Sequence, residues 1–259
     1  MKTLLPKKLY EEVLTYYEAK KESKYIVSKS LPVLFFGDLK KYFQSDLKVI
    51  TVGKNPSGHE FLGDNRFPNY RKTPYSLELS LCEYFKTNPY RKWFRHYDNY
   101  LKEFGSSFYN NSNYNKVVHT DIGSPLSTDP TWKKLDDLDS SFTKELFSSG
   151  FKIWEKLVLE LKPHLVIMCC PFQDSMKKDI FTRLKVEEIE TICTITHKIN
   201  NEPRKIPFKL TYNSIVVGGF STKLIYGGPS VINPFGIIGT ENVKLLGKKT
   251  EALIKREGL

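Results

Sequence analysis

The stretch Lys48–His59 constrains the fold most, because a short apolar run ends there abruptly in turn-forming residues. The β-branched residues of the run predict a buried strand. Gly53 ends the run, and the Asn-Pro and Ser-Gly pairs that follow are strong turn formers. A buried strand that leads into a tight polar loop places side chains at the carboxyl end of a sheet, where open α/β folds bind ligands. An ordinary strand-to-loop connection is the alternative interpretation.

Strands and helices alternate along the rest of the chain, which is typical of an α/β fold. The spacing of apolar residues predicts helices over residues 8–28, 76–86, 89–104, 143–161, 172–184 and 241–256. Short apolar runs predict further strands over residues 116–121, 163–170, 191–197, 206–212 and 215–218, before a Gly- and Pro-rich loop over 218–239. We therefore expect a three-layer α/β/α sandwich with a central, mainly parallel four-stranded sheet and right-handed crossovers.

Neither a repeat nor a linker divides the sequence, so it predicts one domain over residues 1–259. In this prediction residues 1–46 form a helical N-terminal extension and residues 47–259 form the core. Residues 190–215 carry a basic, hairpin-like pattern that either extends a ligand-binding surface or shapes a pocket.

The chain is basic, with 40 Lys and Arg residues against 29 Asp and Glu residues and a net charge of +11. The excess is spread along the sequence, which indicates a positively charged face on a folded body. A polyanion such as nucleic acid is the partner that this charge favours. A surface that is positive only for solubility is the alternative.

The four cysteines, Cys82, Cys169, Cys170 and Cys193, do not have the spacing of a zinc or iron–sulfur site. We expect reduced, mostly buried thiols in a cytoplasmic protein, with no metal and no cofactor. The N-terminus lacks the long apolar run of a signal peptide, and no stretch approaches the length of a membrane span. No membrane association is expected.

Four separated segments together resemble the uracil-DNA glycosylase superfamily. Gly53–Ser57 is similar to the Gly-x-Asn-Pro motif after the family's first strand, and Val117–Asp121 is similar to the second strand, whose last residue reads the base. Val166–Lys178 is similar to the third strand and the helix after it. Gly227–Gly239 is similar to the loop that enters the DNA minor groove. The sequence departs from the family at Gly228, where a His or Asn usually precedes Pro-Ser.

The resemblance implies a monomeric enzyme that acts on DNA, with double-stranded DNA favoured. Such a glycosylase expels a base from the stack, holds it and hydrolyses its bond to deoxyribose. Asn55 matches the position whose side chain orients the attacking water, and a turn-capping Asn is the alternative. Since no lysine stands as a Schiff-base nucleophile, a monofunctional, water-using enzyme is expected.

The same resemblance places several residues around the extruded base. Gly53 lies at the motif itself, and Phe67 matches the aromatic residue under the base, with Phe61 as its competitor and a plain core position as the alternative. Ser57 stands where strict uracil enzymes have a bulky Tyr against C5 of the base. A pocket with Ser57 is expected to accept thymine or a larger group at C5.

Asp121 stands where uracil enzymes have an Asn. A carboxylate accepts a hydrogen bond from the N4 amino group of cytosine and, when protonated, also donates to N3. A carboxylate that faces O4 of uracil meets another acceptor and loses this hydrogen bond. Asp121 therefore favours a cytosine-type edge, with an N-capping role as the alternative. His119 lies on the same strand face and either supports Asp121 or is a core histidine.

Together, Ser57 and Asp121 favour a C5-substituted cytosine, hydroxymethylated or glucosylated as in some phage DNA, and a role in antiviral defence. A broad-specificity uracil or mismatch glycosylase of base-excision repair is the first alternative. A catalytically silent DNA-binding module is the second, favoured by Asn55 and Gly228.

Basic and apolar residues around the pocket are candidates for contacts with DNA. The basic candidates are Lys54, Arg66, Arg71, Lys72, Lys133, Lys134, Lys223 and Lys244. The minor-groove loop candidates are Pro229, Ser230, Val231, Ile232 and Phe235, the last three being apolar wedges or core residues. Whether residues 218–222 or 227–236 form that loop is left open, because Ile215–Gly218 and Lys223–Tyr226 both qualify as the strand before it.

Overall fold

The computed structural model describes residues 2–61, 66–87, 89–109, 114–196, 198–199, 202–203, 206–230, 233–235 and 238–259. The chain divides into two compact units, each made of three segments. Unit 1 comprises Met1–Gln44, Gly53–Tyr90 and Val118–Lys162, and unit 2 comprises Ser45–Val52, Arg91–Val117 and Pro163–Leu259. The expectation of one domain over 1–259, with a core from residue 47, stays a prediction.

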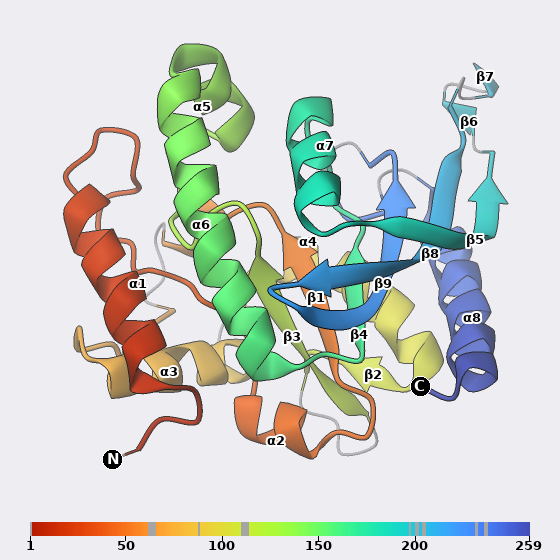
Figure 1. Cartoon of the computed structure of the whole chain (residues 1–259), viewed down its shortest axis with the longest axis horizontal. Helices are drawn as coiled ribbons and strands as arrows, with labels where there is room; N and C mark the ends of the chain where they lie inside the picture. Colours follow the sequence, from red (N-terminus) through yellow and green to blue (C-terminus); the bar gives the residue numbers. More distant parts are fainter. Residues whose placement is uncertain are drawn as a thin grey trace. The chain divides into compact units, whose positions relative to one another are not determined.

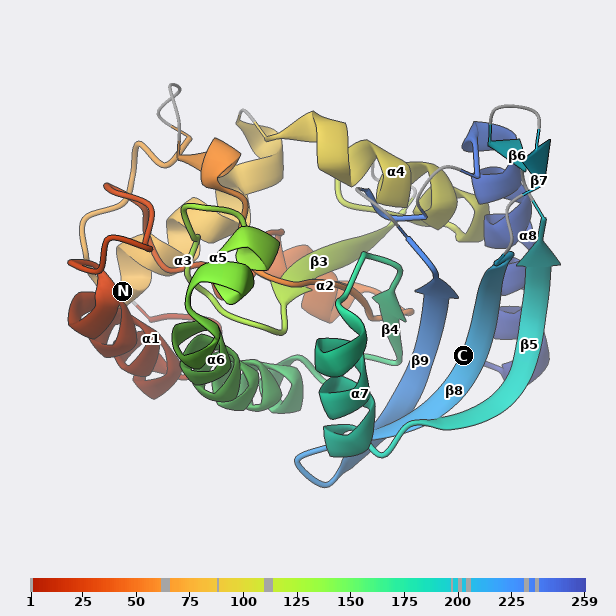
Figure 2. The same cartoon turned by 90° about the horizontal axis from the view of Figure 1, so that it is seen from above.

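Unit 1 is largely helical. Its helices are α1 (Lys7–Lys20), α2 (Leu39–Gln44), α3 (Pro74–Glu83), α5 (Trp132–Leu138) and α6 (Ser140–Leu161), with 3₁₀ turns η1 (Gly58–Glu60) and η2 (Tyr84–Lys86). Helix α1 packs against α3 and α6 (Figure 2). The buried Glu78 of α3 fixes the start of the chain, since its carboxylate accepts hydrogen bonds from Leu4 N at 2.9 Å and Tyr10 Oη at 2.6 Å.

The helix predicted over residues 8–28 is too long. Helix α1 ends at Lys20, because the next residues turn, with Ser23 N bonded to Lys20 O and the Ser23 hydroxyl accepting from Tyr25 N. Ile26, which the helical spacing included, instead forms an antiparallel bridge with Thr128. The helices predicted over 76–86 and 143–161 correspond to α3 with η2 and to α6.

The fold is α/β, with a seven-stranded sheet in place of the four strands expected (Figure 1). The strands, in spatial order, are β2 (Ser106–Ser107), β3 (Asn115–Asp121), β1 (Val49–Gly53), β4 (Leu165–Met168), β9 (Phe220–Gly228), β8 (Phe208–Val217) and β5 (Glu187–Ile195). Pairing is parallel for β2–β3, β1–β4 and β4–β9, and antiparallel for β9–β8 and β8–β5. A separate two-stranded sheet joins β6 (Lys198–Ile199) and β7 (Glu202–Pro203).

The extra strands come from the last third of the chain, where the prediction was wrong in detail. Strand β8 is continuous over the two short strands predicted at 206–212 and 215–218, and β9 occupies much of the predicted loop 218–239. Gly218 and Gly219 form the tight hairpin turn, with φ of 54° and 89°, which favours glycine. Figure 2 shows β9, β8 and β5 side by side.

Helices α4 (Arg91–Leu101), α7 (Asp174–Arg183) and α8 (Thr240–Glu257), with the 3₁₀ turn η3 (Lys102–Phe104), complete unit 2. They match the predictions over 89–104, 172–184 and 241–256. Helix α8 packs against α4 and also contacts β5. The fully buried hydroxyls of Tyr100 and Thr250 share a hydrogen bond at this contact.

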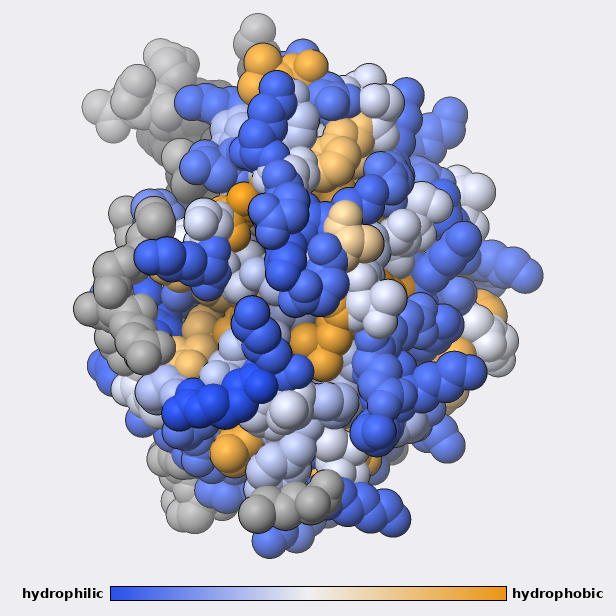
Figure 3. Space-filling model, turned by 90° about the vertical axis from the view of Figure 1, so that its left-hand side faces the viewer, coloured by the Kyte–Doolittle hydropathy of each residue, from blue (hydrophilic) through white to orange (hydrophobic). Residues whose placement is uncertain are grey.

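The surface is mainly hydrophilic on the face drawn in Figure 3, where apolar areas are small and separated. Scattered apolar residues are normal on the surface of a globular protein and do not by themselves mark a contact site.

Candidate active site

The loops after β1 and β3 are tied together by backbone hydrogen bonds in unit 1. Ile122 N donates to Gly53 O at 3.0 Å, and Gly123 N donates to Lys54 O at 2.7 Å. The end of β3 is held in turn by α6, because Trp154 Nε1 donates to the Thr120 hydroxyl at 3.0 Å. Two segments far apart in sequence are thus fixed beside each other, as the position of a site at strand ends requires.

Asp121, the last residue of β3, lies directly over Gly53. It is 6% exposed, and its Oδ1 lies 3.6 Å from Nε2 of His119. Its Oδ2 is buried and has no hydrogen-bond partner among the described residues. A Cβ atom on Gly53 would lie 2.3 Å from Asp121 Oδ1, so only glycine leaves room for this carboxyl. The sequence-predicted residues Gly53, His119 and Asp121 are therefore brought together.

Replacing Gly53 by Ala should displace the Asp121 carboxyl. An activity that depends on this carboxyl should fall by at least about ten-fold, because misplacing a reacting group by ~1 Å can lower the rate by far more. Gly58→Ala is the matched control in the same loop, since its new Cβ would meet Val27 at an ordinary 3.5 Å. Steady-state rates of the two variants test this. Equal activity of Gly53→Ala and Gly58→Ala would contradict the role of this close approach.

Asn55 is anchored through its amide nitrogen. Nδ2 lies 3.4 Å from Leu126 O, 3.3 Å from the Thr128 hydroxyl and 3.3 Å from Pro56 O. All three contacts use Asn55 as the donor, so the amide Oδ1 is left as the acceptor that can hold a water molecule. An aspartate at this position would set a carboxylate against these carbonyl groups. The environment of residue 55 therefore selects an amide.

Ser57 begins the 3₁₀ turn η1. Its hydroxyl accepts from His59 N at 3.3 Å, and its carbonyl accepts from Glu60 N at 3.0 Å. The side chain is half-buried and small, and its proposed role in leaving C5 of a base unobstructed stays a prediction.

Glu60 is a functional candidate that the sequence reasoning missed. It is 3% exposed, its Oε2 accepts from Tyr84 Oη at 2.6 Å, and Arg66 Nε lies 4.0 Å from the same oxygen. Burial raises the pKa of Glu60 to about 7, with a further increase from the charge of Asp121, while Tyr84 and Arg66 oppose the rise. Glu60 is thus a buried acid with a raised pKa that also feels the charge of Asp121, and such perturbed acids are typical of catalytic sites.

In the sequence, Glu60 is recognisable only as an acidic residue of the loop that follows the Asn-Pro turn. Loop acids are usually solvated. The burial of Glu60 depends on contacts with Tyr84, which is distant in sequence, and with Arg66, whose sequence context does not stand out. The sequence pattern alone therefore does not identify Glu60 as a buried acid.

Glu60 should make the stability of the protein depend on pH. Its pKa rises from 4.5 to about 7 on folding, so the native state binds more protons between these values and the free energy of unfolding falls as pH rises through this window. Glu60→Gln keeps the acceptor for Tyr84 and removes the charge. Urea unfolding should find this variant more stable than the parent by up to about 3 kcal/mol at pH 8 and equally stable at pH 4.5.

Glu83→Gln is the control for that measurement, because Glu83 is an acid of the same unit that bonds the exposed Asn69 side chain. Its pH profile should follow that of the parent. Parallel profiles for the parent and Glu60→Gln would show that Glu60 is not a buried acid.

Aromatic rings stack beside these acids. Phe67 stacks on Phe36 at 6.2 Å, on Phe61 at 5.6 Å and on Tyr84 at 6.0 Å between ring centroids. Phe36 also stacks on His119, and the two residues exchange backbone hydrogen bonds at 2.8 and 2.9 Å. Phe36, from the N-terminal segment, is a second site residue that the sequence pattern did not indicate. Both predicted stacking residues, Phe61 and Phe67, lie together.

A pocket of about 460 Å³ opens beside this aromatic group, which is within the range of small-molecule sites. It is lined by Tyr17, Lys29, Ser30, Leu31, Glu60, Phe61, Arg66, Phe67, Tyr70 and Lys72. Four predicted site residues, Phe61, Arg66, Phe67 and Lys72, thus share one cavity with the buried acid Glu60.

The basic residues expected to grip phosphates differ in their settings. Lys72 is exposed at the pocket, whereas Arg66 is half-buried and donates to His59 O at 3.1 Å. Arg71 donates to the carbonyls of Pro68 and Tyr70 at 2.6 and 2.8 Å. Lys54 is half-buried at the end of β1. Arg66 and Arg71 therefore both have structural contacts besides any contact with phosphate.

Lys133 and Lys134 are exposed on α5 of unit 1, and the other predicted DNA contacts belong to unit 2. Lys223 lies over the Tyr212 ring at 5.5 Å, and the Ser230 hydroxyl donates to Cys169 O at 2.9 Å, next to the half-buried Pro229. Val231 and Ile232 lie outside the described residues.

Phe235 is not an apolar wedge. It is fully buried and packs against the rings of Tyr97, Tyr100 and Phe208, which leaves it unable to reach DNA. Its backbone N donates to Cys169 O at 2.9 Å, so the segment after β9 is held against the end of β4.

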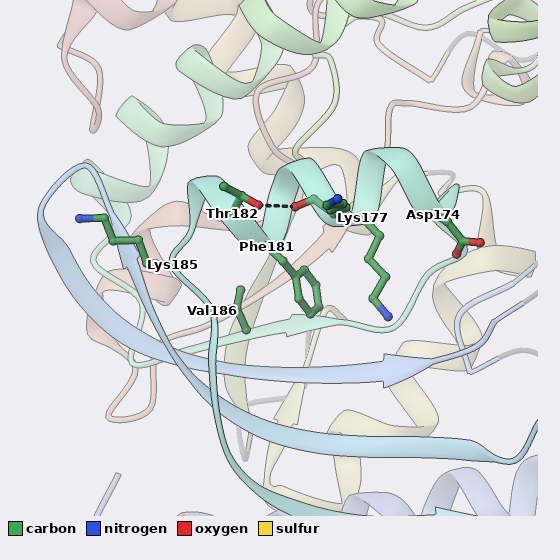
Figure 4. A pocket seen from close by; sticks show the side chains of 7 residues that line it. Asp174, Lys177, Phe181, Thr182, Lys185 and Val186 are labelled. Atoms are coloured by element: carbon green, nitrogen blue, oxygen red, sulfur yellow. Dashed lines mark hydrogen bonds between the residues drawn. The ribbon is translucent and has the colours of Figure 1, made fainter.

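A second cavity, of about 480 Å³, lies along α7 in unit 2 (Figure 4). Lys177 extends from the helix over the rings of Phe181 and Tyr226, at 5.2 and 4.6 Å. Lys178 and Lys185 also line this cavity, which is therefore basic.

A scan against models of known protein families finds no match, and a search of curated proteins finds none. No described helix is both long and apolar enough to cross a membrane. Among the described residues, no three His, Cys, Asp or Glu side chains are grouped so as to hold a metal ion.

Proposed function

We propose that this chain is a monofunctional DNA glycosylase with a uracil-DNA glycosylase-like sandwich fold, and that its substrate is a C5-substituted cytosine. In this proposal the enzyme flips the base out of DNA, cleaves its N-glycosidic bond with water and leaves an abasic site. The order of the four motif-like segments supports it, together with two loops tied at the strand ends.

The observation that carries the proposal is the Asp121 carboxyl. It is buried, one of its oxygens has no hydrogen-bond partner among the described residues, and its charge acts on Glu60, which lines the pocket. A buried polar atom without a partner costs folding free energy, so its retention favours a ligand that satisfies it. The N4 amino group of cytosine is a donor of the required kind.

The proposed chemistry uses the amide of Asn55. Its Nδ2 is held by Leu126 and Thr128, which leaves Oδ1 to accept from a water molecule beneath the sugar. As the bond from C1′ to the base breaks, the base leaves with the electron pair and the water oxygen bonds to C1′. The water proton passes to solvent or to the departing base. In this proposal the rate enhancement comes from positioning of the water and from electrostatic stabilisation of the transition state.

The preference for a substituent at C5 rests on Ser57 and on the pocket volume. Ser57 is small and caps η1, and the pocket lined by Phe61 and Phe67 is larger than an unsubstituted pyrimidine needs. Base stacking on either ring would contribute roughly 1–3 kcal/mol. A requirement for the substituent would spare ordinary cytosine in the genome of the cell, while modified phage DNA would acquire abasic sites.

Incubation with matched duplexes tests the proposal. The duplexes contain cytosine, 5-hydroxymethylcytosine or uracil at one position, and abasic sites are counted by alkaline strand cleavage. Cleavage only at hydroxymethylcytosine is expected. Cleavage at uracil alone would support a repair enzyme instead, and inertness on all DNA would overturn the proposal.

A further inference from the structure

The pocket beside Glu60 has a wall that the glycosylase proposal does not use. Part of this wall comes from the segment before β1, and it is made by Tyr17, Lys29, Ser30 and Leu31. The loop after β1 supplies Glu60, Phe61 and Phe67 to the same lining. A flipped base stacked on Phe61 or Phe67 would therefore share the cavity with the N-terminal segment.

The volume exceeds what a base alone needs. A pocket of about 460 Å³ has room for about fifteen water-sized groups of ~30 Å³ each, roughly twice the number of non-hydrogen atoms in a pyrimidine. The remaining space lies within one continuous cavity. A ligand that fills it carries a second group about as large as the base.

The inner lining is polar and carries hydroxyl groups. Ser30 is 5% exposed, and its hydroxyl oxygen makes no hydrogen bond to any described residue. The Tyr17 hydroxyl donates to Ser30 O at 2.6 Å, which leaves its oxygen as an acceptor. Tyr70 lines the same cavity and is half-buried. A buried serine hydroxyl without a partner is costly unless a ligand satisfies it.

The charges of the lining favour a neutral ligand over an anion in this inner part. Lys29 and Lys72 are exposed and therefore lie at the rim, whereas the buried ionisable group is the acid Glu60, with Arg66 beside it. Lys29 and Lys72 both hold a left-handed backbone, with φ of 61° and 57°. Such strain in residues with side chains is usually retained where a loop must keep one shape for function.

We infer that this N-terminal wall is a subsite for a neutral sugar attached to C5 of the base. The inference rests on the proposed function and goes further, because it selects the glycosylated cytosine over the merely hydroxymethylated one. It also gives the segment before β1 a direct role in specificity. Ser30 and Tyr70 would hydrogen-bond the sugar hydroxyls, and Leu31 would pack against its apolar face.

The test compares two substrates that differ only in the sugar. Duplexes carry either 5-hydroxymethylcytosine or the same base glucosylated on its hydroxymethyl group, and base release is followed in single turnovers. The parent protein should release the glucosylated base at least about ten-fold faster, the effect of one or two added hydrogen bonds. If glucosylation blocks release while hydroxymethylcytosine is still excised, the subsite is wrong and the proposed function stands. Release from neither overturns both.

Two small substitutions then locate the subsite. Ser30→Ala and Tyr70→Phe should each lower release of the glucosylated base about three- to ten-fold and leave release of hydroxymethylcytosine within about two-fold of the parent. Ser80→Ala and Tyr75→Phe are the matched controls, because Ser80 also has a buried hydroxyl without a described partner and Tyr75 is exposed in the same helix. The controls should leave both rates unchanged.

The folded state should survive these changes. Ser30→Ala removes a buried hydroxyl that makes no hydrogen bond in the described part of the chain, so thermal stability should stay equal or rise, as for Ser80→Ala. A loss of activity that is equal on both substrates would contradict a sugar subsite, as would no loss on either.

Discussion

Asn55→Ala should lower the rate of base release by roughly 10²–10³-fold, which is typical for the loss of a residue that stabilises the reacting groups. The affinity for DNA should stay within about two-fold of the parent. The amide is the residue proposed to hold the attacking water, so its loss removes a contact made in the transition state. DNA affinity comes instead from phosphate contacts, which this substitution leaves in place. Single-turnover kinetics and fluorescence anisotropy measure the two quantities.

Asn69→Ala is the control for this experiment. Asn69 is an exposed amide of the same unit whose Nδ2 bonds Glu83 at 3.1 Å. Its rate should equal that of the parent. Activity of Asn55→Ala within about three-fold of the parent, well short of the loss that a transition-state contact predicts, would exclude Asn55 from catalysis.

Asn55→Asp separates chemistry from the local structure. A carboxylate is the better base, yet the neighbours of Nδ2 are the carbonyls of Leu126 and Pro56 and the hydroxyl of Thr128. Replacing the donor by a charge leaves the two carbonyl oxygens opposed to it, which costs roughly 1–3 kcal/mol. The local acceptors therefore explain why this chain has an amide.

Asp121→Asn should invert the choice of base. The amide satisfies the N3 donor and O4 acceptor of uracil, whereas the parent carboxyl satisfies the amino group of cytosine. An active site that is built to hydrogen-bond the edge of one base rejects a base with a different edge by as much as ~10⁴-fold. The ratio of the release rates of the two bases should therefore change by about 10³ or more. Duplexes with 5-hydroxymethylcytosine and 5-hydroxymethyluracil are the right pair, because both carry the same group at C5.

The fold should tolerate Asp121→Asn, since Oδ2 has no described partner to lose and Nε2 of His119 is 3.6 Å from Oδ1. Asp137→Asn, at an exposed position of α5, is the control and should keep the parent preference. An unchanged ratio in Asp121→Asn would place the reading of the base elsewhere, with Glu60 as the next candidate.

Short apolar runs between turn residues could be predicted from the sequence alone. The strands at residues 49–53 and 115–121 lie where expected, because a β-branched run that ends at a Gly or an Asp carries both its burial and its end in adjacent residues. Local patterns therefore predicted where these two strands end. The placement of Asp121 over Gly53 is seen only in the structure.

The rest depends on contacts between distant segments. Glu60 is a buried acid only because Tyr84 and Arg66 contact it, and the pocket is closed on one side by Ser30 and its neighbours. Seven strands form because β8 continues to a Gly-Gly turn and pairs with β9, in a region whose glycines indicated a loop. Phe235, for which the sequence left open a wedge or a core position, is buried by rings from other elements.

Mass spectrometry of the base set free from DNA tests the central proposal most directly. After incubation of the protein with DNA containing hydroxymethylated and glucosylated cytosine, low-molecular-mass products are separated and identified. Free modified cytosine base is expected, with its C5 substituent intact, in an amount equal to the abasic sites formed and with no free cytosine or uracil. Absence of any free base, at protein concentrations that saturate the DNA, would contradict it.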